Sequence, residues 1–235
     1  MKKKIEKILQ FVQKPARYCE LNSVIKDPKK VDLRYAFCFP DLYEIGMSHL
    51  GMKILYSLVN SREDAWCERV FAPDADMEEQ MRKNDVKLFA LESEDDVKEF
   101  DIVGFTLMYE LCYTNVLNML DLAGIPLLSK DRTDLTPIIA CGGPCACNPE
   151  PIADFVDLVF LGDGEESTMQ VLDLLKECKK NGNSKHEFLL KAKDIRGVYV
   201  PSFYEDTYHD DGTLKELKPL FGAPKKIKKA VVSDM

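Results

Sequence analysis

Two glycine-containing loops, each directly after an apolar run, offer the most suggestive chemistry in the sequence. Residues 141–151 read Cys-Gly-Gly-Pro-Cys-Ala-Cys-Asn-Pro-Glu-Pro, and residues 162–166 read Gly-Asp-Gly-Glu-Glu. Adjacent glycines let backbone approach a ligand closely, although a tight turn without a ligand explains them equally well. Free N–H groups at a helix start favour a polar group, but the acidic side chains of 162–166 could cap that helix themselves. The second loop therefore favours hydroxyl or amide groups over a bare phosphate.

Three thiols, Cys141, Cys145 and Cys147, lie within seven residues and raise the question of an iron–sulfur or zinc site. The Cys-x3-Cys-x-Cys spacing places two sulfurs too close together to face one metal without distortion, and no fourth cysteine or histidine is near. We therefore expect buried or loop thiols and no metal site. All eight cysteines are expected to be reduced, because a chain of 235 residues can bury a core without disulfides.

Polar residues also lie at the ends of two other apolar runs, 33–39 and 102–107. Asp41, Glu44 and His49 follow the run at 33–39, and no partner completes a catalytic triad around them. A histidine in this place can ligate a metal or a cobalt-bearing cofactor, but such a residue more commonly caps a helix or packs. Polar and aromatic groups at the end of the run 102–107 suit a flat organic ligand, a domain contact or partial core packing. These groups are Thr106, Tyr109, Glu110 and Tyr113.

Strand and helix patterns alternate along the segment that must position these loops. Continuous apolar runs predict strands, and apolar stripes of helical period predict helices between them. We expect Ser48 to cap the second helix, the strand at 66–71 to be partly exposed, and residues 88–91 to form a short strand at best. The strands are predicted at 33–39, 66–71, 102–107, 137–140 and 156–161, and the helices at 4–13, 50–59, 77–83, 116–123 and 171–178.

This alternation predicts an α/β fold, with a parallel five-stranded sheet covered on both faces in a flavodoxin-like, doubly wound order. Ligands bind such sheets at the carboxyl ends of the strands, where the loops named above would meet. We expect an N-terminal helix and connecting segment at 1–31 and the α/β domain at 32–180. A helix and a β-hairpin appendage would follow at 181–223, and a basic linker at 224–235.

Composition excludes several function classes. The chain has 32 basic and 40 acidic residues and a net charge of −8, which argues against coating nucleic acid. No phosphate-binding glycine motif is present, which argues against nucleotide triphosphate hydrolysis. No apolar run approaches the ~20 residues that cross a bilayer, and the basic start precedes an amphipathic stretch rather than a secretory signal. We expect a cytoplasmic protein without membrane contact.

Several of these motifs together resemble a known family. The loops after the fourth and fifth strands resemble the carboxyl half of the cobalamin-binding domain of radical SAM proteins. Other segments resemble the N-terminal region of uncharacterised bacterial radical SAM proteins that carry a cobalamin-binding-like domain, and the resemblance covers about residues 15–180. The motifs are Gly142-Gly143-Pro144, Asn148-Pro149-Glu150-Pro151, Asp157, Gly162-Asp163-Gly164-Glu165, the segments 37–55 and 104–126, and Pro15-Ala16-Arg17-Tyr18 with Asn22 and Ser23.

The resemblance implies that cobalamin or a related cofactor binds across the strand ends. Backbone at the glycines would approach the cofactor tail, Glu165 would bond its polar groups, and the loop at 41–49 would approach the corrin. The Ser48-His49-Leu50-Gly51 run does not match the Asp-x-His-x-x-Gly motif that supplies a cobalt-ligating histidine. The implied cofactor-binding residues are Asp41, Glu44, His49, Thr106, Tyr109, Glu110, Gly142, Gly143, Pro144, Asn148, Gly162, Asp163, Gly164 and Glu165.

The resemblance also implies a partner, the radical SAM barrel of the same polypeptide. That barrel would hold the 4Fe-4S cluster and S-adenosylmethionine through a Cys-x3-Cys-x-x-Cys triplet, which this chain lacks. We therefore expect an N-terminal fragment of an iron–sulfur enzyme, without catalytic residues of its own. Two alternatives stay open: a cofactor-free structural domain that docks on the barrel, and an independent iron–sulfur or zinc protein that uses the cysteines at 141–147.

Overall fold

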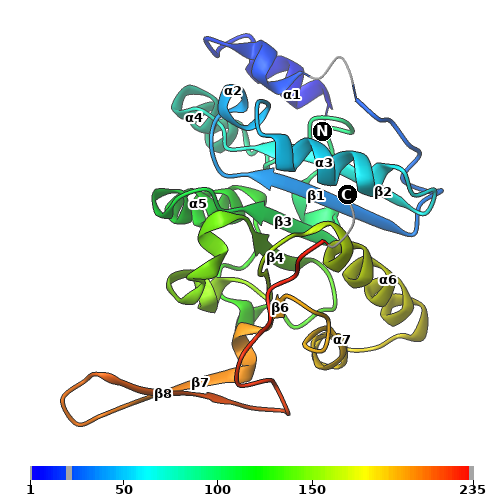
Figure 1. Ribbon diagram of the computed structural model, residues 1–235. Helices are drawn as coiled ribbons and strands as arrows, with labels where there is room; N and C mark the ends of the chain where they lie inside the picture. Colours follow the sequence, from blue (N-terminus) through cyan, green and yellow to red (C-terminus); the bar gives the residue numbers. More distant parts are fainter. Residues whose placement is uncertain (1, 20–22, 233–235) are drawn as a thin grey trace.

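Six strands form one sheet in the order β2-β1-β3-β4-β5-β6 in the computed structural model, which describes residues 2–19 and 23–232 (Figure 1). The first five strands are parallel, and β6 is antiparallel to β5. The α/β class and the mostly parallel sheet are confirmed, but the sheet has six strands instead of the expected five. The strands are β1 Leu33–Phe39, β2 Ala65–Phe71, β3 Ile102–Thr106, β4 Ile138–Gly142, β5 Leu158–Phe160 and β6 Val198–Tyr199.

Helices cover both faces of the sheet, which explains why the parallel strands are buried along nearly their whole length. Buried side chains of α1, α4 and α5 pack on one face, and those of α3, α6 and α7 pack on the other. Figure 1 shows these helices around the sheet. The helices are α1 Lys2–Leu9, α2 Tyr43–Gly46, α3 Leu50–Asn60, α4 Ala75–Asn84, α5 Tyr113–Ala123, α6 Glu165–Asn181 and α7 Lys185–Ala192. Short 3-10 turns lie at Pro15–Tyr18, Val97–Glu99, Glu110–Cys112, Ser129–Asp131, Pro144–Cys147, Glu150–Phe155 and Pro201–Phe203.

Local patterns placed most elements well, with two differences in the first half of the chain. The first helix ends at Leu9, before the expected residue 13. The strand β2 is buried throughout instead of partly exposed. The connecting segment contributes to this burial at Trp66, whose indole donates a hydrogen bond of 2.9 Å to the carbonyl of Val24. Residues 88–91, where a short strand at best was expected, form only an isolated bridge from Phe89 to Asp96.

The expected hairpin is present in the C-terminal part, where β7 (Tyr204–Tyr208) and β8 (Leu214–Pro219) project from the body (Figure 1). Residues 198–199 join the main sheet as β6. The segment after the hairpin contacts the carboxyl end of β5. There the N–H of Ala230 donates to the carbonyl of Leu161 (2.8 Å), and its carbonyl accepts from the N–H of Asp163 (3.1 Å).

A buried ionic cluster at the amino ends of β4 and β5 joins three otherwise separate segments. One carboxylate oxygen of Asp157 lies 2.7 Å from Lys185 Nζ and 3.1 Å from Arg132 Nη2. Its other oxygen accepts a hydrogen bond of 2.8 Å from the N–H of Ile139 in β4. All three charged residues are buried, so each charge depends on the others for compensation.

The Asp157→Ala variant tests this cluster. We expect the free energy of unfolding to fall by about 3–5 kcal/mol, because Arg132 and Lys185 would stay buried without a counter-charge. Urea denaturation monitored by circular dichroism measures the change. The matched control is Asp194→Ala, whose side chain is 70% exposed and which should change stability by less than about 0.5 kcal/mol. Equal effects of the two substitutions would contradict this role.

Candidate functional site

A cavity of about 180 Å³ lies between the sheet and helices α3 and α6, towards the carboxyl ends of the strands. Its walls come from the sheet strands β1, β3, β4 and β5, and from α3, α6 and the loops before these helices. It opens to solvent beside Gly143, Gly162 and Asp163, which line it and are exposed. This is the edge at which open α/β sheets bind their ligands.

The cavity exists because the centre of this face of the sheet carries little side-chain volume. Gly104 of β3 pairs with Phe37 of β1 on one side and with Ala140 of β4 on the other. A Cβ atom on Gly104 would lie 2.1 Å from the hydroxyl oxygen of Tyr35. The absence of a side chain at Gly104 therefore lets the Tyr35 ring cross the neighbouring strand.

Three buried residues bring hydroxyl groups to the cavity. Tyr35, Thr106 and Thr168 line it and are only 5%, 6% and 3% exposed. None of these hydroxyls makes a hydrogen bond within the described residues, 2–19 and 23–232. Burial raises the pKa of the Tyr35 phenol, so this group stays neutral. The residues are buried, but their hydroxyl oxygens are accessible from the cavity, so all three can bond water or a ligand there.

The structure brings eight of the fourteen expected cofactor-binding residues to this cavity. They are His49, Thr106, Gly142, Gly143, Gly162, Asp163, Gly164 and Glu165. The other six lie outside its lining: Asp41, Glu44, Tyr109, Glu110, Pro144 and Asn148.

Two of the outlying carboxylates have partners within the protein. Glu44 lies 2.9 Å from Arg17 Nε, and this guanidinium lowers the pKa of the carboxyl. The pair fastens the N-terminal segment to α2. Asp41 accepts a hydrogen bond of 2.7 Å from the Tyr109 hydroxyl and so links the loops after β1 and β3. None of the residues in these two contacts lines the cavity.

The four loop glycines divide into two kinds. Gly143 (φ +100°) and Gly162 (φ +96°) adopt backbone conformations that disfavour side chains, and a Cβ on either would contact protein backbone within 3 Å. Gly142 and Gly164 have ordinary backbone and border the cavity, with the nearest neighbouring atoms of a Cβ at 3.4 and 3.5 Å. The protein's own turns thus require Gly143 and Gly162, whereas Gly142 and Gly164 leave room for a ligand.

His49 caps α3, in place of the expected Ser48. Its Nδ1 accepts a hydrogen bond of 3.1 Å from the N–H of Met52, while the Ser48 hydroxyl donates to the carbonyl of Ile45. A neutral imidazole that accepts at Nδ1 carries its proton on Nε2. The remaining nitrogen is therefore a donor, and ligating a metal through it would require the cap to break.

The three cysteines at 141–147 differ in burial. Cys141 is buried on the opposite face of β4, and burial raises the pKa of its thiol to about 12. Cys145 is partly exposed and Cys147 is exposed. Among the described residues, no group of three or more histidine, cysteine or acidic side chains is placed to hold a metal ion.

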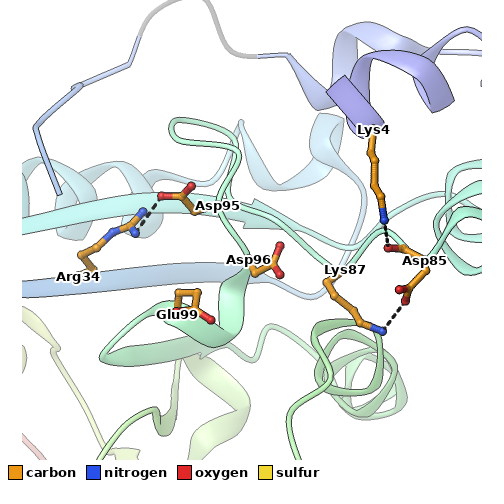
Figure 2. Close-up of a pocket in the computed structure, with 7 residues that line it drawn as sticks. All are labelled: Lys4, Arg34, Asp85, Lys87, Asp95, Asp96 and Glu99. Atoms are coloured by element: carbon orange, nitrogen blue, oxygen red, sulfur yellow. Dashed lines mark hydrogen bonds and ion pairs between the residues drawn. The ribbon is translucent and has the colours of Figure 1, made fainter. Parts of the chain in front are cut away.

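A second, wider hollow of about 690 Å³ lies at the opposite, amino end of the sheet (Figure 2). Arg34 pairs with Asp95 at 3.0 Å, and Lys87 pairs with Asp85 at 3.0 Å. Most of its charge is thus compensated internally, and it lies at the end of the sheet that α/β proteins do not use for ligands. The cavity at the carboxyl ends is the better candidate.

Sequence reasoning missed Tyr35, Gly104 and Thr168. A glycine inside an apolar strand often marks a close approach of another group, and Gly104 within 102–107 carried that signal. Tyr35 and Thr168 carried none, because their placement depends on strand register and on how α6 packs.

Alanine substitutions separate the two kinds of glycine. Gly143→Ala should lower the free energy of unfolding by about 1–3 kcal/mol, because its backbone conformation is open only to glycine. Gly164→Ala should change it by less than about 0.5 kcal/mol. Thermal and urea unfolding of both variants measures this, and equal losses would show that the glycines do not differ in role.

The pH dependence of stability tests the cap at His49. Burial lowers the pKa of this imidazole, so the unfolded chain binds the proton first as pH falls below about 6.5. The contribution of neutral His49 is therefore complete above that pH and is lost as pH falls through the folded-state pKa. His49→Asn retains a capping side chain without titrating. Between about pH 7 and about pH 5, the free energy of unfolding measured with urea should fall less in the variant than in the wild type. Equal losses in the two proteins would contradict the role of His49 as a titrating cap.

Among the described residues, no helix combines the length and apolar character of a membrane span.

Comparison with known proteins identifies the family. Residues 51–201 match the family described as radical SAM proteins, N-terminal. An uncharacterized protein of Methanocaldococcus jannaschii is 25% identical over 177 residues, which cover 74% of this chain and 33% of the relative. The chain thus spans about one third of the length of that relative. No solved structure matches the chain. Because the family match extends over more than half of the sequence, the chain belongs to the N-terminal domains of radical SAM proteins.

Proposed function

We propose that this domain binds cobalamin or a related cofactor at the carboxyl ends of its strands, for use by a radical SAM barrel in the same polypeptide. The observation that carries the proposal is the cavity between sheet and helices, with three buried hydroxyls that no described residue satisfies. The strand order β2-β1-β3-β4-β5 supports it, since this is the flavodoxin-like order, which binds ligands at this edge.

The dimensions of the cavity limit what enters it. A cavity of about 150 Å³ accepts a benzene ring, so about 180 Å³ accepts one ring system and not a corrin. The residues present therefore fit one arm of the cofactor, with Tyr35, Thr106 and Thr168 as its hydrogen-bond partners. Exposed apolar side chains on elements beside the cavity offer contact area to a larger flat group. They are Leu50 and Ile54 on α3 and Leu111 after β3.

The residues of this chain would bind and orient the cofactor rather than react. Bound cobalamin supplies a cobalt centre that carries methyl groups or changes oxidation state. While His49 accepts at Nδ1 to cap α3, its Nε2 carries the proton and has no lone pair for a metal, so the cobalt would be held without this histidine as a ligand.

Titration of the purified chain with hydroxocobalamin tests the proposal. We expect saturable binding in the micromolar range, seen by calorimetry and by a change in visible absorbance that indicates a cobalt without histidine coordination. Gly164→Val should weaken binding about tenfold or more, because the added side chain would project into the cavity. The control Gln170→Val lies on the exposed side of α6 and should bind as the wild type does. Equal affinity of both variants, or no binding by the folded chain, would contradict the proposal.

A cofactor-free domain that docks on the barrel is the second candidate. This candidate is favoured by the C-terminal segment, which already forms hydrogen bonds with the loop after β5. The N–H of Val232 donates to the Asp163 carboxylate (2.9 Å), and Ala230 bonds on either side of Gly162. This candidate predicts that hydroxocobalamin produces neither heat nor a spectral change.

A further inference from the structure

The three unpartnered hydroxyls lie at separate points of the cavity wall. The Tyr35 oxygen lies over Gly104 in the middle of the sheet. Thr106 Oγ1 is 3.0 Å from the position that a Cβ on Gly143 would take, at the end of β3. Thr168 Oγ1 is 3.7 Å from the corresponding position on Gly164, at the start of α6. A ligand that satisfied all three would need hydrogen-bonding atoms on more than one edge.

The charges around the cavity favour a neutral ligand. Its lining contains no lysine or arginine, and its acidic side chains are Asp163 and Glu165 beside the mouth. An anionic group inside would face these carboxylates without a cation to compensate it. The hydroxyls can each donate and accept, so they suit a neutral group that carries both kinds of atom.

The lining and the volume of the cavity favour a ring. Phe37 and Phe160 contribute aromatic walls and Leu55 an aliphatic one. The volume of about 180 Å³ suits one ring system with an open side towards solvent. A ring that displaced water from the hydroxyls without replacing its hydrogen bonds would lose affinity.

We propose that this cavity selects a neutral purine-type ring, whose nitrogens and amino group bond Tyr35, Thr106 and Thr168, over a dimethylbenzimidazole ring, whose methyl edge leaves hydroxyls unpaired. This inference rests on the proposed function in assigning the cavity to a cofactor arm. The purine chemistry has two sources, the base of such an arm or a free nucleoside. Selection follows from hydrogen bonding, since both rings are flat and of similar size.

The first experiment titrates the chain with adenine and with 5,6-dimethylbenzimidazole, followed by calorimetry and by line broadening of ligand proton resonances. We expect adenine to bind about tenfold tighter, since each satisfied hydroxyl contributes about 2- to 12-fold. Tyr35→Phe and Thr168→Val should each weaken adenine binding about fivefold and leave dimethylbenzimidazole within about twofold. Tyr208→Phe, on the projecting hairpin, is the matched control and should change neither.

The second experiment distinguishes the two sources and the two proposals. It compares cobalamin with an analogue in which adenine replaces dimethylbenzimidazole, and both with adenosine. Tighter binding of the adenine analogue supports the inference with a cofactor arm as ligand. Binding of adenosine alone, weakened by Tyr35→Phe, overturns the proposed function and leaves the inference standing with a nucleoside as ligand. Equal binding of both cobalt cofactors, unchanged in the hydroxyl variants, overturns the inference and leaves the proposed function standing. If the folded chain binds none of these probes, both are overturned.

Discussion

A parallel sheet is normally packed with side chains on both faces. In this sheet Phe37, Gly104 and Ala140 lie side by side, so the neighbouring strands β3 and β4 have almost no side-chain volume at that level. Helices α3 and α6 cover this face and contact each other. The hollow is therefore a consequence of strand register. The Tyr35 ring is the one large group directed over Gly104, and it ends in a hydroxyl that no described residue satisfies.

The loops around this hollow are fixed by contacts at both ends of the sheet. At the amino end, Asp157 bonds the backbone of β4 and neutralises two buried cations, which sets the position of β5. At the carboxyl end, Gly143 and Gly162 adopt conformations that turn the chain sharply after β4 and β5. The returning segment at Ala230 then closes over Gly162. Contacts at both ends of the sheet thus position the loops around the cavity, and such fixed loops would favour the binding of a ligand.

Local sequence patterns predicted the strands and helices of the α/β core because each is specified by its own apolar run or helical period, as residues 33–39 and 50–59 illustrate. They also predicted the edge of the sheet at which the cavity lies. They failed where distant residues decide the outcome. The burial of Trp66 depends on Val24, and the pairing of residues 198–199 depends on the free edge of β5. The meeting of Tyr35 with Gly104 depends on register between strands, which no local pattern encodes.

The proposed function depends on three hydroxyls that face an open cavity. A high-resolution crystal structure of the purified chain tests this arrangement most directly. We predict an open cavity beside Gly104, with ordered water or a bound molecule within hydrogen-bonding distance of Tyr35, Thr106 and Thr168. A cavity closed by movement of α3 or α6, with these hydroxyls bonded to the protein itself, would contradict it.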